Sequence, residues 1–337
     1  MLDGAVKDAR RSRRGRRDGS RVAALDLGTN NCRLLIASPS RGGNLRIVDS
    51  FSRIVRLGEG VAHTGELSSA AIDRTIAALK ICSDHIQAKG ARRVRAIATE
   101  ACRRASNASV LLERARDEAG IELTIISATE EARLAAIGCA PLIDLQADGG
   151  LIFDIGGGST EVIWMRRDER GVPFVAASAS EPAGVVTLSD EWAGRPADRE
   201  GYSAMRAEII ERFRPLRAEM DHLAPFDPVT HHLLGTSGTV TTLAGIALGL
   251  ARYNRDRVDA SWHRCADILS IIDRLVELDL KGRAAVGCVG ADRADLIVPG
   301  CAIFAAIVEL WPCAQLRVAD RGLREGILRE LLAEGRS

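Results

Sequence analysis

Hydrophobic and polar residues alternate along this chain with two periods, one typical of strands and one of helices. Short apolar runs at 94–99 and 123–126 have the length of buried strands. Longer stretches at 68–89, 108–120 and 199–223 repeat apolar residues at the spacing of one helix face. Strand-like and helical segments alternate in both halves of the chain, which predicts α/β layers with helices packed on sheets.

The remaining predicted elements extend this alternation to the end of the chain. Further strands are expected at 45–57, 174–181, 233–236 and 316–319, and further helices at 127–138, 237–250, 265–279 and 291–311, with a closing helix from Leu323.

One segment of the chain occurs twice: the pattern at 25–36 returns without a gap at 153–164. In each copy an apolar run ends in an aspartate, Asp26 or Asp154, and a turn of small residues leads into a second apolar run. Each copy predicts strand, tight turn and strand. One copy alone is typical of an ordinary β-hairpin. Two aligned copies indicate a related unit in each half, the two facing each other across a cleft.

Three turns of small residues follow predicted strands, at 28–31, 156–159 and 235–239. Glycine permits positive φ and close backbone approach, and consecutive N–H groups in a tight turn suit phosphate oxygens. The third turn leads directly into a helix, whose N-terminus favours an anion; an ordinary strand–helix connection is the alternative. The candidate phosphate-binding residues are Gly28, Thr29, Asn30, Asn31, Gly156, Gly157, Gly158, Ser159, Gly235, Ser237, Gly238 and Thr239.

Carboxylates near the first two turns suggest a metal ion bound by oxygen. Asp26 and Asp154 end their strands, and Glu161 follows Asp154 across the turn, so that these groups can face one cleft. Mg²⁺ takes one or two such carboxylates together with waters and substrate phosphate. The alternative for Glu161 is an exposed strand residue.

The sequence between the two repeats holds charged groups suited to acid–base work. Glu130 and Glu131 open a predicted helix, where a carboxylate also serves as an ordinary helix-dipole residue. A general base must reach the water aimed at a terminal phosphorus, and the wall between two phosphate-binding halves is a suitable place for it. Arg103 follows a strand and can pin a phosphate or balance developing charge; its alternative is a surface ion pair.

Composition narrows the classes of protein that remain. The chain has 337 residues, of which 46% are apolar. Its net charge of only +1 argues against a protein that is drawn to nucleic acid by its overall charge. Its length favours two domains. The expected division is a basic arm at 1–20, a first α/β domain at 21–134 and a second at 135–337. The arm is either a solvated tail or an electrostatic device that gathers a polyanion.

The eight cysteines are scattered, without zinc-like spacing. No secretory signal and no 18-residue apolar span is evident, so a cytoplasmic protein with reduced thiols and no membrane segment is expected.

These motifs together resemble the exopolyphosphatase/guanosine pentaphosphate phosphatase family of the actin–hexokinase-like superfamily, over residues 22–334. The second turn, Asp154 to Glu161, is the strongest carrier of the resemblance, and Glu130-Glu131-Ala132-Arg133 makes it particular. Further carriers are Ala24 to Asn30, Ala98 to Asn107, Gly235 to Thr239 and Asp320 to Gly326. Cys102, Ala128 and Asn31-Cys32 depart from the family's usual residues without removing a proposed catalytic group.

The resemblance implies two actin-like (ribonuclease H-like) α/β lobes with an interdomain cleft, and a Mg²⁺-dependent hydrolase that removes terminal phosphates from inorganic polyphosphate or pppGpp. By motif match, Glu131 would activate water, Asp154 and Glu161 would hold metal with Asp26 opposite, and Arg103 would orient the chain end. Mn²⁺ as a substitute, a monovalent cation such as K⁺ and a homodimer are further expectations from the family. Longer members carry additional helical domains after the two-lobed core.

Three alternative functions would use some of the same predicted site residues. A pppGpp 5′-phosphohydrolase would use the same residues, and sequence does not separate it from an exopolyphosphatase. A kinase of the same superfamily would transfer phosphate to an acceptor instead of water. A polyphosphate or alarmone sensor would bind without turnover, but the intact Glu131, Asp154 and Glu161 argue against it.

Overall fold

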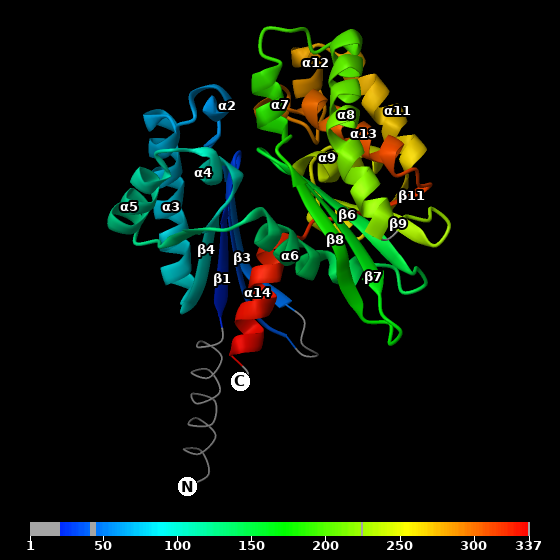
Figure 1. Cartoon of the computed structure of the whole chain (residues 1–337). Helices are drawn as coiled ribbons and strands as arrows, with labels where there is room; N and C mark the ends of the chain where they lie inside the picture. Colours follow the sequence, from blue (N-terminus) through cyan, green and yellow to red (C-terminus); the bar gives the residue numbers. More distant parts are fainter. Residues whose placement is uncertain (1–20, 41–44, 224, 336–337) are drawn as a thin grey trace.

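The structure, a computed structural model, describes residues 21–40, 45–223 and 225–335. The basic arm predicted at 1–20 lies outside these residues. Two mixed sheets, each with its own helices, make two lobes side by side (Figure 1). Within the described part of the chain no helix is both long and apolar enough to cross a membrane.

The first lobe is built on a five-stranded sheet in the order β3-β2-β1-β4-β5. β2 pairs antiparallel with both β1 and β3. β4 pairs parallel with both β1 and β5. The strands are β1 (Val22–Leu27), β2 (Asn31–Pro39), β3 (Leu45–Ile54), β4 (Arg93–Ala98) and β5 (Leu123–Ile125).

The second lobe repeats this topology in a six-stranded sheet, β10-β11-β9-β6-β7-β8. β6 pairs antiparallel with β7 and parallel with β9, as β1 does with β2 and β4. This match confirms the duplicated unit predicted from the two hairpins. The strands are β6 (Gly149–Ile155), β7 (Thr160–Arg167), β8 (Pro173–Glu181), β9 (His231–Thr236), β10 (Trp262–Arg264) and β11 (Gln315–Ala319).

Helices cover the outer face of each sheet (Figure 1). Ser68 caps the first long helix by accepting a hydrogen bond from Ala71 N, and Gly90 ends it with a φ of 64°. The first lobe has α2 (Val61–Thr64), α3 (Ser69–Lys89), α4 (Glu100–Arg104) and α5 (Ala108–Ala119). The second has α7 (Val185–Glu191), α8 (Arg199–Leu223), α9 (Ser237–Ala247), α10 (Arg255–Val258), α11 (Cys265–Glu277), α12 (Leu280–Ala285), η3 (Ala291–Arg293) and α13 (Ile297–Leu310).

One predicted helix begins later than the sequence suggests. The stretch 291–311 was expected to be continuous, but α13 starts at Ile297 and residues 291–293 form a separate short turn, η3. Gly290 precedes this turn with a φ of 72°, and Leu296 N donates to the carbonyl of Arg293 at 3.0 Å just before α13 begins.

Two helices, α6 (Ala128–Cys139) and α14 (Leu323–Glu334), lie between the sheets, with η2 (Ala140–Leu142) following α6 (Figure 1). Apolar side chains of α14, such as Ile327 and Leu328, pack on the first sheet, although α14 is at the end of the chain. Ala135 and Ala136 of α6 pack against the second sheet. The division at residue 134 stays a prediction, and the chain crosses between the lobes both within α6 and again before α14.

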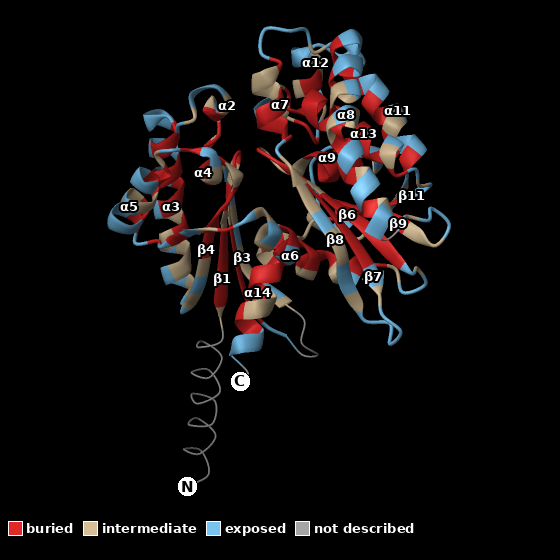
Figure 2. Ribbon diagram, viewed as in Figure 1, coloured by how far each residue is buried: buried red, intermediate tan, exposed pale blue. Residues whose placement is uncertain are grey.

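The largest apolar core of the described residues lies in the second lobe (Figure 2). In this core α13 packs against the second sheet and the neighbouring helices. Twelve of its 14 residues are buried, and the ring of Phe304 meets that of Phe153 on β6 edge-on at 5.8 Å between centroids. This packing anchors β6, whose end carries Asp154.

Candidate active site

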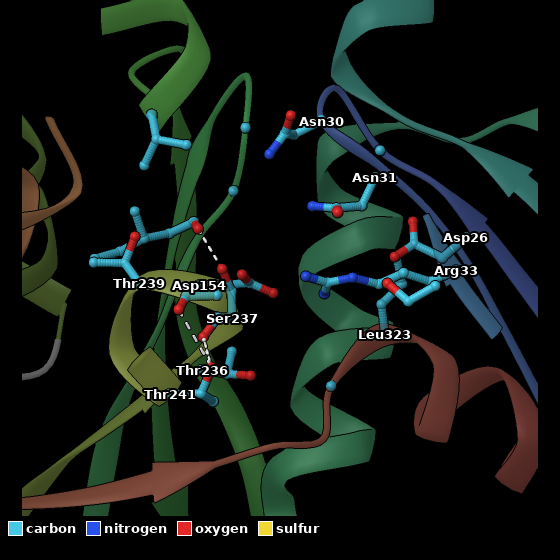
Figure 3. Close-up of a pocket in the computed structure, with 18 of the residues that line it drawn as sticks. Asp26, Asn30, Asn31, Arg33, Asp154, Thr236, Ser237, Thr239, Thr241 and Leu323 are labelled. Atoms are coloured by element: carbon cyan, nitrogen blue, oxygen red, sulfur yellow. Dashed lines mark hydrogen bonds between the residues drawn. The ribbon is translucent and has the colours of Figure 1, made fainter. Parts of the chain in front are cut away.

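A cavity of about 550 Å³ opens between the lobes. The ends of β1, β6 and β9 and the turns that follow them supply much of its wall, and Figure 3 shows labelled side chains from both lobes lining it. Of the predicted phosphate-binding and metal-binding residues, all except Gly235 line this cavity, and Glu131 lines it as well.

The first two turns have the same backbone geometry. Gly28 N donates to Asn31 O at 2.9 Å, and Gly156 N donates to Ser159 O at 2.9 Å. The two turns also touch: a Cβ on Gly157 would lie 3.0 Å from the backbone nitrogen of Asn30. A side chain at position 157 would be crowded against Asn30 and Thr29, so glycine favours the close approach of the two turns, which line the cavity side by side.

The third turn gives the cavity a helix N-terminus. β9 ends at Thr236, and Ser237, the first residue of α9, adopts a φ of 77°, which is strained for a residue with a side chain. The first N–H groups of α9 have no carbonyl partner within the helix and favour an anion. Gly235 has another role, since a Cβ there would lie 2.7 Å from both the Phe153 ring and Val240, and its absence permits close packing.

The acidic groups gather at the base of the cavity. In the second hairpin Asp154 is paired across the strands with Glu161, whose Oε1 accepts from Ser159 at 2.6 Å and from Ser180 at 2.8 Å. Burial, together with repulsion from Glu161, raises the pKa of Asp154 to about 7. Burial also raises the pKa values of Asp26 and Glu161. These shifts show that the carboxylates share one poorly solvated space.

Glu131 is positioned by the first turn of α6. Ser127 caps this helix by accepting from Glu130 N, and the side chain of Glu131 is only 15% exposed. Its pKa is raised well above the usual value by burial and by repulsion from Glu161, against the opposing attraction of Arg103. The neighbouring Glu130 points elsewhere and pairs with Arg95 and Arg133, which lower its pKa to about 2. Adjacent carboxylates therefore have opposite environments.

Arg103 lies behind Glu131 and outside the cavity lining. Its Nη1 donates to Glu131 Oε2 at 2.7 Å and to the Ile126 carbonyl at 3.0 Å, while its Nε donates to Glu100 Oε2 at 2.9 Å. In the structure Arg103 pairs with the carboxylates of Glu100 and Glu131. Its predicted contact with the end of the substrate stays a prediction.

The residues present fit a divalent cation. Charged carboxylates that repel one another in a buried space need a counter-ion, and within the described residues the buried side-chain oxygens of Asn30 and Asn31 have no hydrogen-bond partner. The described residues contain no group of three His, Cys, Asp or Glu placed to hold a metal by themselves. A cation that keeps several waters and uses substrate oxygens, as Mg²⁺ does, suits this arrangement.

Several arginines of the cavity were not singled out from the sequence. Arg33 is paired with Asp26 across the first hairpin, and in the aligned repeats it occupies the position of Glu161. That alignment could have identified it, because both hairpins direct this position to the same side. Arg33 and Arg293 both come within 4 Å of the place where a Cβ of Gly238 would lie. Arg324 also lines the cavity, from a segment noticed only for its resemblance.

Comparison with known proteins agrees with this geometry. The family model of the Ppx/GppA phosphatase family matches residues 35–334. Exopolyphosphatase 2 of Mycobacterium tuberculosis is 33% identical over 326 residues, covering 93% of this chain and 98% of that protein. A guanosine-5′-triphosphate,3′-diphosphate pyrophosphatase of Photobacterium profundum is 29% identical over 93% of this chain but only 60% of its own length.

Solved structures of the family have the same two-lobed fold. The Aquifex aeolicus Ppx/GppA protein superposes with a TM-score of 0.76 at 30% identity, covering 94% of this chain and 99% of that one. An exopolyphosphatase from Cytophaga hutchinsonii gives 0.83 at 25% identity, over 93% and 98% of the two chains. The predicted fold class of two actin-like α/β lobes is confirmed. The chain belongs to the Ppx/GppA phosphatase family.

Proposed function

We propose that this phosphatase is an exopolyphosphatase that uses Glu131 to activate water. One observation carries the proposal: Glu131, the carboxylates Asp26, Asp154 and Glu161, and three anion-binding turns line a single cavity. Hydrolysis of a terminal phosphate requires a base, a way to offset negative charge and donors for the phosphoryl oxygens, and this cavity brings these groups together.

The chain's own groups have separable tasks in this proposal. Backbone N–H groups of the turns at 28–31 and 156–159 and of the α9 N-terminus bind the anionic oxygens. Glu131 accepts the proton of the attacking water at its carboxylate, and its raised pKa makes it a better base than an exposed glutamate.

Asp154 and Glu161 would hold Mg²⁺, with Asp26 on the opposite wall. When bound, the ion would offset the charge of the phosphoryl oxygens. Ser159 and Ser180 orient Glu161 through the hydrogen bonds described above, so one of its oxygens is committed to protein donors.

The second candidate substrate is pppGpp, because a relative at 29% identity is named for that kind of nucleotide. The exopolyphosphatase reading is favoured because the exopolyphosphatase 2 relative is both more similar and nearly the same length. Both substrates present a terminal phosphoanhydride to the same groups.

The decisive experiment compares phosphate release from long polyphosphate, short polyphosphate and pppGpp, with Mg²⁺ and with EDTA. We expect the highest kcat/KM with polyphosphate and no turnover in EDTA. A higher kcat/KM with pppGpp would assign the nucleotide phosphatase activity instead. Absence of release from all three, with ATP consumed only when an acceptor is added, would indicate a kinase.

A further inference from the structure

Glu100 is a carboxylate of the cavity to which neither the motifs nor the proposed mechanism gives a task. It is the first residue of α4, its side chain is 14% exposed, and it lines the cavity. The second glycine turn packs on it, since a Cβ on Gly158 would lie 2.9 Å from Glu100 Cγ. A negative charge in this place is unfavourable for binding a polyanion, so its presence needs another explanation.

One oxygen of Glu100 lies against the Nε side of the Arg103 guanidinium. Glu100 Oε2 lies 2.9 Å from Nε and 2.8 Å from Nη2 of Arg103. The contact at Nε is a hydrogen bond, whereas Nη2 is within ion-pair distance but has no hydrogen-bond partner among the described residues. Nη1 donates to Glu131 Oε2 and to the carbonyl of Ile126. Arg103 therefore contacts the base through a single nitrogen and a single carboxylate oxygen.

The orientation of Arg103 matters because an arginine whose Nη1–Nη2 edge faces a carboxylate pairs with it through two parallel hydrogen bonds. Such a fork would engage both oxygens of Glu131 and lower its basicity. Within the described residues, the hydrogen bond that Arg103 donates to Glu131 reaches Oε2 and leaves Oε1 without a protein donor. One oxygen fixes the side chain and the other is available to water.

We propose that Glu100 is a positioning residue: it holds the Arg103 guanidinium in the orientation that gives Glu131 one hydrogen bond, and so keeps the second oxygen of the base free. The inference rests on the proposed function, because it assumes that Glu131 activates water. Glu100 acts through Arg103 and does not itself contact the reacting atoms.

The test begins with Glu100→Gln, which keeps the shape of the side chain but replaces the charge-assisted contact with a weaker one. We expect kcat for phosphate release to fall about tenfold and KM to stay within about twofold, because ground-state binding does not depend on this contact. A lower KM with unchanged kcat would mean that Glu100 acts only by repelling substrate, and would overturn the proposal. The matched control is Glu130→Gln, one residue from the base but paired with Arg95 and Arg133 outside the cavity; it should keep the wild-type kcat.

A double-mutant cycle with Arg103→Lys distinguishes positioning from a general structural effect. Lysine at position 103 cannot contact Glu100 through two nitrogens as arginine does. In the Arg103→Lys background, Glu100→Gln should therefore lower kcat little further. If the losses of kcat from the two single substitutions simply add in the double mutant, the proposal is overturned. Glu100→Asp keeps the charge and should retain more activity than Glu100→Gln. Equal losses of kcat in these two variants, at equal melting temperatures, would also contradict the proposal. Wild-type protein that releases no phosphate from any substrate would instead refute the proposed function.

Discussion

Arg103 on α4 donates a 2.7 Å hydrogen bond to Glu131 on α6. The contact joins a helix of the first lobe to the helix that runs between the two sheets. It fixes the direction of Glu131 while the buried surroundings hold the pKa of that carboxyl above its ordinary value. Arg103 therefore orients the base and partly offsets the rise in its pKa, which burial and Glu161 cause.

Glu131→Gln is expected to lower kcat by about 10²–10⁴-fold, the usual contribution of a general base. Glutamine keeps the shape and can still accept from Arg103, so substrate binding should change little. Phosphate release gives kcat, and equilibrium binding of polyphosphate in EDTA gives affinity. Turnover like that of the wild type would reject Glu131 as the base.

The acid limb of the kcat profile should report the same group. Glu131 must be deprotonated to accept a proton, so activity is lost as pH falls through its raised pKa. The midpoint should lie above 4.5, the ordinary value for glutamate. Rate measurements at saturating substrate and Mg²⁺ across pH 4–8 locate this midpoint. A midpoint at or below the ordinary value would contradict the buried environment found here.

Metal binding and pH should be linked through Asp154. In the metal-free protein its folded pKa of about 7 exceeds the ordinary 3.8, so the folded state holds the proton more tightly. This contribution to stability is complete below the ordinary pKa and is lost as pH rises through about 7. Mg²⁺ prefers the ionised carboxylate, so it should raise the melting temperature more at pH 8 than at pH 5.

The size of this effect follows from mass action. At about 100 times its Kd, a ligand of the folded state adds about 2.7 kcal/mol to the free energy of unfolding. Thermal melts with Mg²⁺ or EDTA at both pH values measure it, and Asp154→Asn is the control that should lose most of the difference. If Mg²⁺ shifts the melting temperature equally at the two pH values, Asp154 is not a ligand of the metal.

Alanine at Gly138 or Gly326 should destabilise the protein where α6 and α14 cross. A Cβ on Gly138 would lie 2.0 Å from the carbonyl oxygen of Gly322, and one on Gly326 would lie 2.0 Å from that of Leu134. In an unobstructed helix the same change stabilises by about 0.5–1 kcal/mol. Here we expect a loss of about 1–3 kcal/mol from overpacking against backbone. Urea unfolding of both variants decides the sign.

The pairing of residues within each hairpin was predictable from the alternation of apolar residues. Apolar runs flanking each aspartate determine the antiparallel register that sets Asp26 against Arg33 and Asp154 against Glu161. Long helices such as α3 and α8 also follow from their apolar periodicity. The short helices α2, α7 and α12 were not predicted, because segments of a turn or two have too few residues to show a helical period.

The candidate site was predicted less completely than the fold. Residue types and turn spacing identified the acidic and glycine positions, but the partner of Arg103 depends on how α4 meets α6. Arg293 comes from η3 and Arg324 from α14, far along the chain from either hairpin. A side chain supplied by such a distant element carries no local signal.

Local sterics and the two-residue period of a strand are sufficient to specify the duplicated strand–turn–strand units, with their glycines and the acidic residues at their ends. The return of α14 to the first sheet, the contact of the two turns through Gly157 and Asn30, and the arginine shared by Glu100 and Glu131 depend on how the elements pack. Those relationships arise from burial of apolar faces belonging to residues distant in the chain. No short-range pattern encodes which distant faces will meet.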